Sequence, residues 1–354
     1  MIRLLVVEDS ALMRKLLGNI FKAEPDFEVG FAKDGTEALA MIGDFRPDVI
    51  TLDIHMPTMD GLTCLDRIML EHPCPVVMVS SLTADGAEET LIALDMGAVD
   101  FIEKPAGAIS LAIEELAPHL VEKVRTAAAV RLRKSRRLSE RLRLGNSARH
   151  PRVKVQAQTI STAASKGLVL VGASTGGPPA LDAILSGLPG DFPWPIVIAQ
   201  HMPASFTGPL SRRLDRLCAL TVSEVRLPTV LEPGHAYIAR GDADIIISKR
   251  AGKLTAMSAP MDTDRLWHPS VERLVETAMA HVPAEALIGV LMTGMGNDGA
   301  RAMTDLKAAG GQTIAEAEET AVVWGMPGEL VRLGGAGNVV PLEKIGSQIL
   351  DCLP

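Results

Sequence analysis

The chain has 354 residues, of which 47% are hydrophobic, and a formal net charge of −8. This length exceeds that of a usual single domain, so we expect two domains, each with enough apolar residues for its own core. The N-terminus MIRLLVVEDS has no signal-peptide pattern, and the sequence has no uninterrupted run of about 18 apolar residues, the length that spans a membrane. The sequence therefore predicts a cytoplasmic protein that does not insert into membranes.

The first 122 residues alternate between short apolar runs and segments of helical periodicity that begin near Ser10, Asp34, Asp60, Thr83 and Gly107. This fivefold alternation predicts a doubly wound, five-stranded parallel sheet of the flavodoxin-like type. The predicted strands are IRLLVV (2–7), FEVGFA (27–32), DVITLDI (48–54), PVVMVSS (75–81) and VDFIEK (99–104).

Charged and polar side chains follow the carboxyl ends of these strands, where ligands bind in open parallel sheets. They are Glu8, Asp9, Asp53, Ser81 and Lys104. Each alone has an ordinary explanation, such as a helix cap or a turn residue. Three carboxylates at one edge repel one another unless a cation joins them, and a set of oxygen ligands favours Mg²⁺. The sequence therefore predicts a magnesium site used in phosphate chemistry.

The segments VVEDS, TLDIHMPTMDG, MVSS and FIEKP resemble, in this order, the motifs of bacterial response-regulator receiver domains. The resemblance implies that Asp53 accepts a phosphoryl group from a histidine kinase. It also implies that Glu8, Asp9 and Asp53 hold the Mg²⁺, that Lys104 pairs with the phosphoryl oxygens, and that Ser81 and Phe101 form the switch pair.

Residues 123–166 form a basic connector with thirteen lysines and arginines and a single acidic residue, Glu140. Its first half has good helix formers, and its second half is rich in turn residues, so we expect a helix end followed by a linker. A nucleic-acid-binding arm is the alternative for such a basic stretch. The four cysteines include no C-x-x-C pair, which favours reduced thiols over disulfides or a zinc site; they are Cys64, Cys74, Cys218 and Cys352.

Residues 167–354 form the second predicted domain, which is again α/β. The strands LVLVGAS, PIVIAQ and ALIGVLMTG alternate with helical segments and predict a mainly parallel sheet. Residues 235–258 contain closely spaced strands and a turn at Ala251 and Gly252, which predicts an antiparallel hairpin beside that sheet.

Ser174 lies in LVLVGASTGG, between a strand and a helix, and GASTG fits the G-x-S-x-G pattern of a nucleophilic serine. A phosphate-binding glycine loop is the alternative. His201 and Asp298 also follow strands of the same predicted sheet, which favours a serine, histidine and aspartate triad. His235 and His268 are competing bases, but both occur in turns, where a histidine is usually a loop or cap residue.

The segments GASTGG, AQHMP and TGMGNDG resemble the signature segments of the chemotaxis protein-glutamate methylesterases, in which a receiver domain precedes the catalytic domain. The resemblance implies hydrolysis of glutamate methyl esters on methyl-accepting chemoreceptors, with release of methanol, and deamidation of receptor glutamines. It implies Ser174 as nucleophile, His201 as base, Asp298 as orienting acid and the Met295 N–H as oxyanion donor. The chemistry of such a triad needs no cofactor in the esterase site. The glycines expected to admit oxyanion and substrate are Gly172, Gly176, Gly177, Gly294 and Gly296.

Two other functions are alternatives to a phosphorylation-activated esterase. A receiver joined to a nucleotide-binding module predicts tight nucleotide binding without ester cleavage at Ser174, but no Gly-Lys-Ser/Thr loop is present. A transcription factor could use the basic connector, but no helix-turn-helix pattern follows it, so no nucleic-acid partner is expected.

Overall fold

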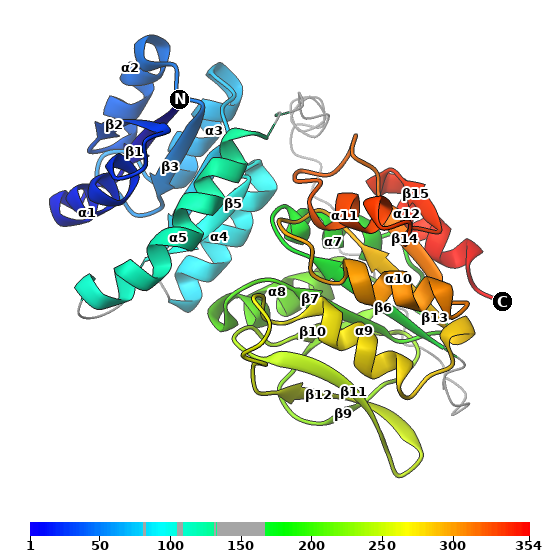
Figure 1. The fold of residues 1–354 in the computed structure, drawn as a ribbon. Helices are drawn as coiled ribbons and strands as arrows, with labels where there is room; N and C mark the ends of the chain where they lie inside the picture. Colours follow the sequence, from blue (N-terminus) through cyan, green and yellow to red (C-terminus); the bar gives the residue numbers. More distant parts are fainter. Residues whose placement is uncertain (81–82, 105–108, 131, 133–166) are drawn as a thin grey trace. The chain divides into compact units, whose positions relative to one another are not determined.

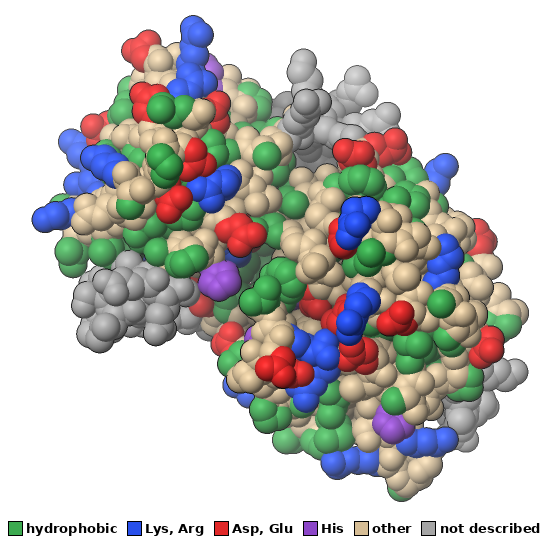
Figure 2. All heavy atoms as spheres, in the orientation of Figure 1, with side chains coloured by type: hydrophobic (Ala, Val, Ile, Leu, Met, Phe, Trp, Pro, Cys, Tyr) green, Lys and Arg blue, Asp and Glu red, His purple; other side chains and the backbone are tan. Residues whose placement is uncertain are grey.

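The computed structural model describes the whole chain except residues 81–82, 105–108, 131 and 133–166. Two compact units divide at residues 149 and 150, and each is described by itself. Figure 1 follows the chain through both units, and Figure 2 shows charged side chains of both signs interspersed with apolar ones on the faces in view. Most of the basic connector lies outside the described residues. Among the described helices, none combines the length and apolar character that a membrane span needs.

The first unit contains the predicted five-stranded parallel sheet, in the order β2-β1-β3-β4-β5. Its strands are β1 (Ile2–Val7), β2 (Phe27–Ala32), β3 (Val49–Asp53), β4 (Val76–Ser80) and β5 (Asp100–Glu103). Its helices are α1 (Ala11–Lys22), α2 (Gly35–Phe45), α3 (Gly61–Glu71), α4 (Ala84–Met96) and α5 (Ile109–Ala128). Because α1 packs against α5 and α3 contacts both α2 and α4, the helices form two layers, as in a doubly wound fold.

Four helices of this unit begin where the sequence predicts, because a capping side chain precedes each. The side chain of Ser10 accepts the Met13 N–H, and the residues Asp34, Asp60 and Thr83 accept in the same way at α2, α3 and α4. The predicted start at Gly107 lies outside the described residues. Helix α5 continues to Ala128, six residues beyond the boundary expected at residue 122.

The second unit contains a seven-stranded parallel sheet in the order β15-β14-β13-β6-β7-β10-β8. Its strands are β6 (Leu168–Ala173), β7 (Ile196–Gln200), β8 (Thr221–Val225), β10 (His235–Ala239), β13 (Leu287–Leu291), β14 (Gln312–Glu316) and β15 (Asn338–Val340). Its helices are α7 (Gly177–Leu185), α8 (Ala204–Leu217), α9 (Val271–Met279), α10 (Ala300–Ala308), α11 (Met326–Arg332) and α12 (Leu342–Asp351), with a 3₁₀ turn at Ala284–Ala286. Helix α10 packs against α9 and α11, whereas α7 packs against α8 and α12, so the sheet lies between two helical layers.

A second, antiparallel sheet has the order β11-β12-β9, with β9 (Thr229–Val230), β11 (Asp244–Arg250) and β12 (Lys253–Ala259). The predicted hairpin is confirmed for β11 and β12, whose turn residues Ala251 and Gly252 have φ of 47° and 79°. Residues His235–Ala239 do not belong to it, contrary to the prediction. They form β10, which pairs in parallel with β7 and β8, because a short apolar run fits either kind of sheet.

Candidate functional sites

The three predicted triad residues follow three adjacent strands in the middle of the seven-stranded sheet. Ser174 follows β6, His201 follows β7, and Asp298 lies in the loop after β13. Strand β6 pairs with β13 on one side and with β7 on the other, all in parallel. Their carboxyl ends therefore meet at one edge, and this arrangement brings Ser174, His201 and Asp298 to the same edge.

Ser174 lies in a tight turn between β6 and α7, and backbone hydrogen bonds hold it from both sides. Its N–H donates to the Thr293 carbonyl at 3.0 Å, and its carbonyl accepts the Gly177 N–H at 2.7 Å. The Gln200 side-chain amide donates to the Ser174 carbonyl at 2.9 Å and to the His201 carbonyl at 3.1 Å. The half-buried serine is thus fixed to the ends of both neighbouring strands.

Two glycines allow this turn to form. Gly176 has a φ of 77°, a left-handed conformation that glycine adopts without steric cost. A Cβ at Gly294 would lie 2.7 Å from the Ser174 Cβ, so only glycine lets the loop after β13 approach the serine this closely. The Met295 N–H follows directly, and within the described part of the chain it donates no hydrogen bond.

His201 is paired with Asp298 and almost excluded from solvent. Its Nε2 lies 2.8 Å from Asp298 Oδ2, and the exposed fractions of the two side chains are 9% and 4%. Its other nitrogen, Nδ1, is buried and has no hydrogen-bond partner in the described residues. The imidazole plane lies parallel to the Trp267 ring, with 6.2 Å between the ring centroids.

Asp298 lies against the N-terminus of α9. Besides His201, it accepts hydrogen bonds from the Ser270 hydroxyl at 3.1 Å and from the backbone N–H groups of Val271 and Glu272 at 2.7 and 3.0 Å. Burial acts to raise the pKa of Asp298, but the hydrogen bond and charge of His201 and the backbone donors outweigh it. The pKa therefore lies below its ordinary value, and the carboxylate stays ionised.

The two competing histidines have other partners. His235 Nδ1 lies 2.9 Å from the Pro233 carbonyl, and its ring stacks on Tyr237. His268 Nδ1 lies 2.8 Å from Oδ1 of the buried Asp244. Neither histidine is hydrogen-bonded to a residue of the Ser174 turn.

The first unit brings its predicted carboxylates together at the carboxyl ends of β1 and β3. One oxygen each from Glu8, Asp9 and Asp53 lies within 4.8 Å of the others; Glu8 and Asp53 are buried, and Asp9 is exposed. Lys104 Nζ lies 2.6 Å from Asp53 Oδ2 and 3.1 Å from Glu8 Oε2. Burial and, next, the charge of Asp53 raise the pKa of Glu8 to about 7.

Burial acts to lower the pKa of Lys104, but its hydrogen bonds and charge interactions with the carboxylates raise it overall, so one cation is fixed at the cluster. Burial, and after it the charge of Asp53, makes ionisation of Glu8 unfavourable, and a further cation at the cluster would favour the ionised form. The donor set is carboxylate oxygen, which hard divalent ions such as Mg²⁺ prefer. The residues present therefore fit a magnesium ion.

Of the two predicted switch residues, the structure describes only Phe101. Ser81 lies outside the described residues. Phe101 is buried on β5, and Lys123 Nζ lies 5.1 Å above its ring centre.

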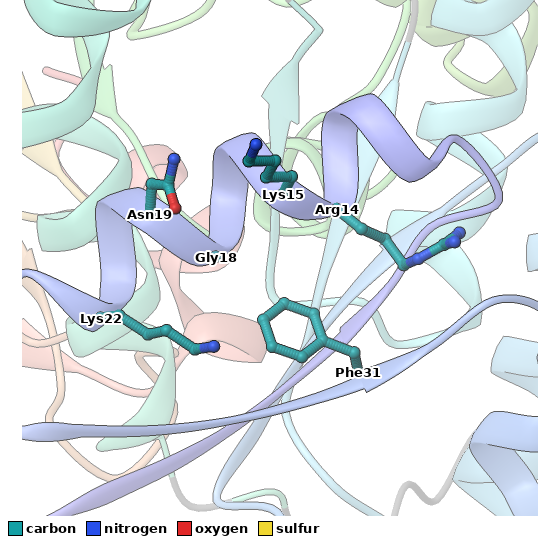
Figure 3. A pocket seen from close by; sticks show the side chains of 6 residues that line it. All are labelled: Arg14, Lys15, Gly18, Asn19, Lys22 and Phe31. Carbon is teal, nitrogen blue, oxygen red and sulfur yellow. The ribbon is translucent and has the colours of Figure 1, made fainter.

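A shallow pocket on the same unit lies between α1 and β2 (Figure 3). Lys22 Nζ lies 4.9 Å above the Phe31 ring in this pocket. Arg14 Nη1 donates to the carbonyls of Glu8 and Asp9, so one lining residue also supports the acidic cluster. The lining residues are Arg14, Lys15, Gly18, Asn19, Lys22 and Phe31.

The predictions from the sequence did not include several residues that surround Ser174, His201 and Asp298 in the second unit. Ser270 caps α9 and donates to Asp298, and the signal for it was a serine directly before the helical segment VERL. Gln200 and Trp267 carry no sequence signal of this kind, because their roles depend on contacts between segments that are distant in the chain.

Comparisons with known proteins give a matching family for each of the two units. Residues 4–114 match the response regulator receiver domain family and residues 169–349 match the CheB methylesterase family. A protein-glutamate methylesterase/protein-glutamine glutaminase of Rhodopseudomonas palustris is 55% identical over 99% of this chain and 98% of its own length. A protein of the same name from Caldanaerobacter subterraneus is 44% identical over 99% of this chain and 96% of its own length.

Among solved structures, the CheB methylesterase catalytic domain of Thermotoga maritima is 38% identical, with a TM-score of 0.52, and covers 53% of this chain and 100% of that one. The resemblance that the motifs indicated is therefore confirmed over nearly the whole length. The chain belongs to the family of receiver-linked protein-glutamate methylesterase/protein-glutamine glutaminases.

Proposed function

We propose that Ser174, His201 and Asp298 are the catalytic triad with which this enzyme hydrolyses glutamate methyl esters of chemoreceptors. The observation that carries this proposal is the buried His201–Asp298 hydrogen bond of 2.8 Å at the sheet edge where the Ser174 turn lies. A histidine oriented by a buried carboxylate next to a serine turn is the arrangement that activates a weak hydroxyl nucleophile.

The hydrogen bonds of His201 indicate its working tautomer. Because Asp298 is ionised and can only accept, Nε2 carries the single proton of the neutral imidazole, and Nδ1 of that form is unprotonated. We therefore assign Nδ1, buried and without a partner, as the atom that takes the Ser174 hydroxyl proton.

In the reaction that we propose, Ser174 Oγ forms a bond to the ester carbonyl carbon while its proton moves to His201. The carbon–methoxy bond then breaks, and His201 returns the proton to the leaving oxygen, which departs as methanol. Water, activated by the same nitrogen, hydrolyses the acyl-enzyme to a glutamate carboxylate. A glutamine side chain would follow the same path and release ammonia.

The Met295 N–H is the proposed donor to the oxyanion that forms in each step. Its lack of another hydrogen bond among the described residues, and the close approach of Gly294 to Ser174, support this role.

Phosphorylation of Asp53 is the proposed control. Glu8, Asp9 and Asp53 would hold Mg²⁺, which neutralises charge on the transferring phosphoryl group, and Lys104 would pair with its oxygens. The proposed phosphodonor is a chemotaxis histidine kinase, and the switch pair would be Ser81 and Phe101.

Methanol release from a methylated chemoreceptor tests this function. We expect release by the full chain, stimulation by a small phosphodonor with Mg²⁺, and loss of release in Ser174→Ala. Undiminished methanol release by folded Ser174→Ala would exclude Ser174 as the nucleophile.

A further inference from the structure

Glu316, the last residue of β14, is a buried carboxyl group that is linked to the Ser174 turn through Thr293. Its side chain is fully excluded from solvent, and its Oε2 accepts the Thr293 N–H at 2.8 Å. Its other oxygen, Oε1, is buried and has no hydrogen-bond partner among the residues that the structure describes. The triad chemistry proposed above makes no use of this group.

Thr293 links Glu316 to the serine turn through every polar group that it has. Its carbonyl accepts the Ser174 N–H at 3.0 Å, and its hydroxyl donates to the Thr175 carbonyl at 2.8 Å. The same hydroxyl accepts the Val323 N–H at 3.0 Å. Thr293 also directly precedes Gly294 and Met295, so any shift of its backbone moves the nucleophile and the proposed oxyanion donor together.

We propose that Glu316 is a positioning residue of the esterase: through Thr293 it fixes the Ser174 turn and the loop that carries the Met295 N–H. This inference rests on the proposed function and adds a residue to it. An acceptor is required at this place, because a buried N–H without one is left unsatisfied, and only a shift of the backbone relieves it.

The ionisation of Glu316 should make the reaction depend on pH, and this dependence can be measured. Burial raises the pKa of Glu316 to about 7, and the charge of Glu343 on α12 acts in the same direction. The Thr293 N–H acts to lower the pKa of Glu316. The Thr320 hydroxyl acts in the same direction, while its own hydrogen bond goes to the Ala317 carbonyl. A negative charge that appears here near neutral pH would oppose the oxyanion forming at the neighbouring loop.

The test compares Glu316→Leu with Glu316→Gln in the full chain. We would measure kcat and KM for methanol release, and the rate constant for labelling of Ser174 by a fluorophosphonate, which needs no receptor. Glu316→Leu removes the acceptor, and we expect kcat and labelling to fall about 10- to 100-fold with little change in KM. Glu316→Gln keeps an acceptor for the Thr293 N–H, and we expect it to recover most of that loss.

Labelling of Glu316→Leu at the wild-type rate, or labelling of Glu316→Gln as slow as that of Glu316→Leu, would overturn the positioning role. Should Glu316→Leu fail to fold, Glu316→Met is labelled instead, because it also removes the acceptor of the Thr293 N–H but is closer to glutamate in length. We expect slow labelling of Glu316→Met, and labelling at the wild-type rate would contradict the proposal.

The pH dependence supplies a readout that simple destabilisation would not move. The ratio of the labelling rates of Glu316→Gln and wild type should increase as pH rises through about 7. A constant ratio would exclude an ionising Glu316 beside the reaction. If wild type itself is not labelled at Ser174, the proposed function fails; with labelled wild type, only the positioning role is at stake.

Discussion

Replacement of Asp298 by asparagine tests whether the carboxylate is essential to both the fold and the chemistry. Oδ1 accepts the Glu272 N–H and the Ser270 hydroxyl, and Oδ2 accepts the Val271 N–H and His201 Nε2. An asparagine offers one oxygen and one NH₂ group. Whichever way the amide is oriented, its NH₂ group faces a backbone N–H that cannot rotate away.

The expected loss in the free energy of unfolding follows from the contact between two donors, the asparagine NH₂ group and a backbone N–H. One buried N–H without an acceptor costs about 1–3 kcal/mol. The lost negative charge at the N-terminus of α9 adds about 0.3–1 kcal/mol. We therefore expect the free energy of unfolding to fall by about 1–4 kcal/mol.

The catalytic effect depends on which group faces His201. If the NH₂ group faces it, Nε2 must accept, and the imidazole proton moves to Nδ1, the nitrogen assigned to take the serine proton. By analogy with the tautomer effect in other serine hydrolases, kcat should fall by up to about 10⁴-fold. This loss should be smaller than that caused by removing Ser174 itself.

The assays are urea unfolding and methanol release, with Ser270→Ala as the matched control. Ser270→Ala removes one donor to Asp298 and one helix cap but leaves the carboxylate and His201 in place, so stability should fall by about 0.5–2 kcal/mol and kcat only slightly. Wild-type stability and kcat in Asp298→Asn would refute the reasoning.

The effect of Asp298 on stability should also depend on pH in one direction. Its pKa in the folded protein lies below the ordinary 3.8, so the stabilisation is present above that pH and is lost as pH falls through the folded value. The difference in unfolding free energy between wild type and Asp298→Asn should therefore persist at neutral pH and shrink in acid. A difference that grows below about pH 4 would contradict the assigned direction of the pKa shift.

Three further outcomes are expected. Ser174→Ala and His201→Ala should each lower kcat by several orders of magnitude, and the double variant should be hardly worse, because triad members act as a unit; strictly additive losses in methanol release would contradict this. Asp53→Asn should remove the stimulation of methanol release by a small phosphodonor with Mg²⁺, and persistent stimulation would move the phosphorylation site elsewhere. Glu316 has an ordinary pKa of 4.5 and a folded value of about 7, so the stability that it contributes is complete below the first value and is lost as pH rises through the second. Between these values Glu316→Gln should gain about 3 kcal/mol relative to wild type in urea unfolding, and an unchanged gap would refute burial of an ionising group.

Local signals made much of the fold predictable from the sequence. Ser10, Asp34, Asp60 and Thr83 each cap a helix by bonding a nearby N–H, so the helix starts could be located without knowledge of the tertiary structure. The strand HAYIA was wrongly joined to a hairpin, because its apolar pattern says nothing about its partner. That partner, β7, lies about 40 residues earlier in the chain.

The site of the second unit likewise contains residues whose placement the sequence predicts and one, Glu316, whose placement it does not. The placement of Ser174, His201 and Asp298 at one sheet edge could be predicted because each directly follows a strand of the same sheet or lies in the loop beyond it. Glu316 could not, because it stands in the acidic run AEAEE, which reads as exposed. Its burial depends on tertiary packing, because β14 lies between β13 and β15 and contacts α10, α11 and α12.

The central place of β6 in its sheet has a consequence for how the enzyme loses activity. Edge strands such as β15 and β8 can open while the middle of a sheet stays intact, because each central strand is bonded on both sides. The amides of β6 should therefore exchange with deuterium only on global opening of the catalytic unit. Inactivation by heat or urea should accordingly coincide with cooperative unfolding of that unit, and local opening of its edge strands should leave Ser174 in place.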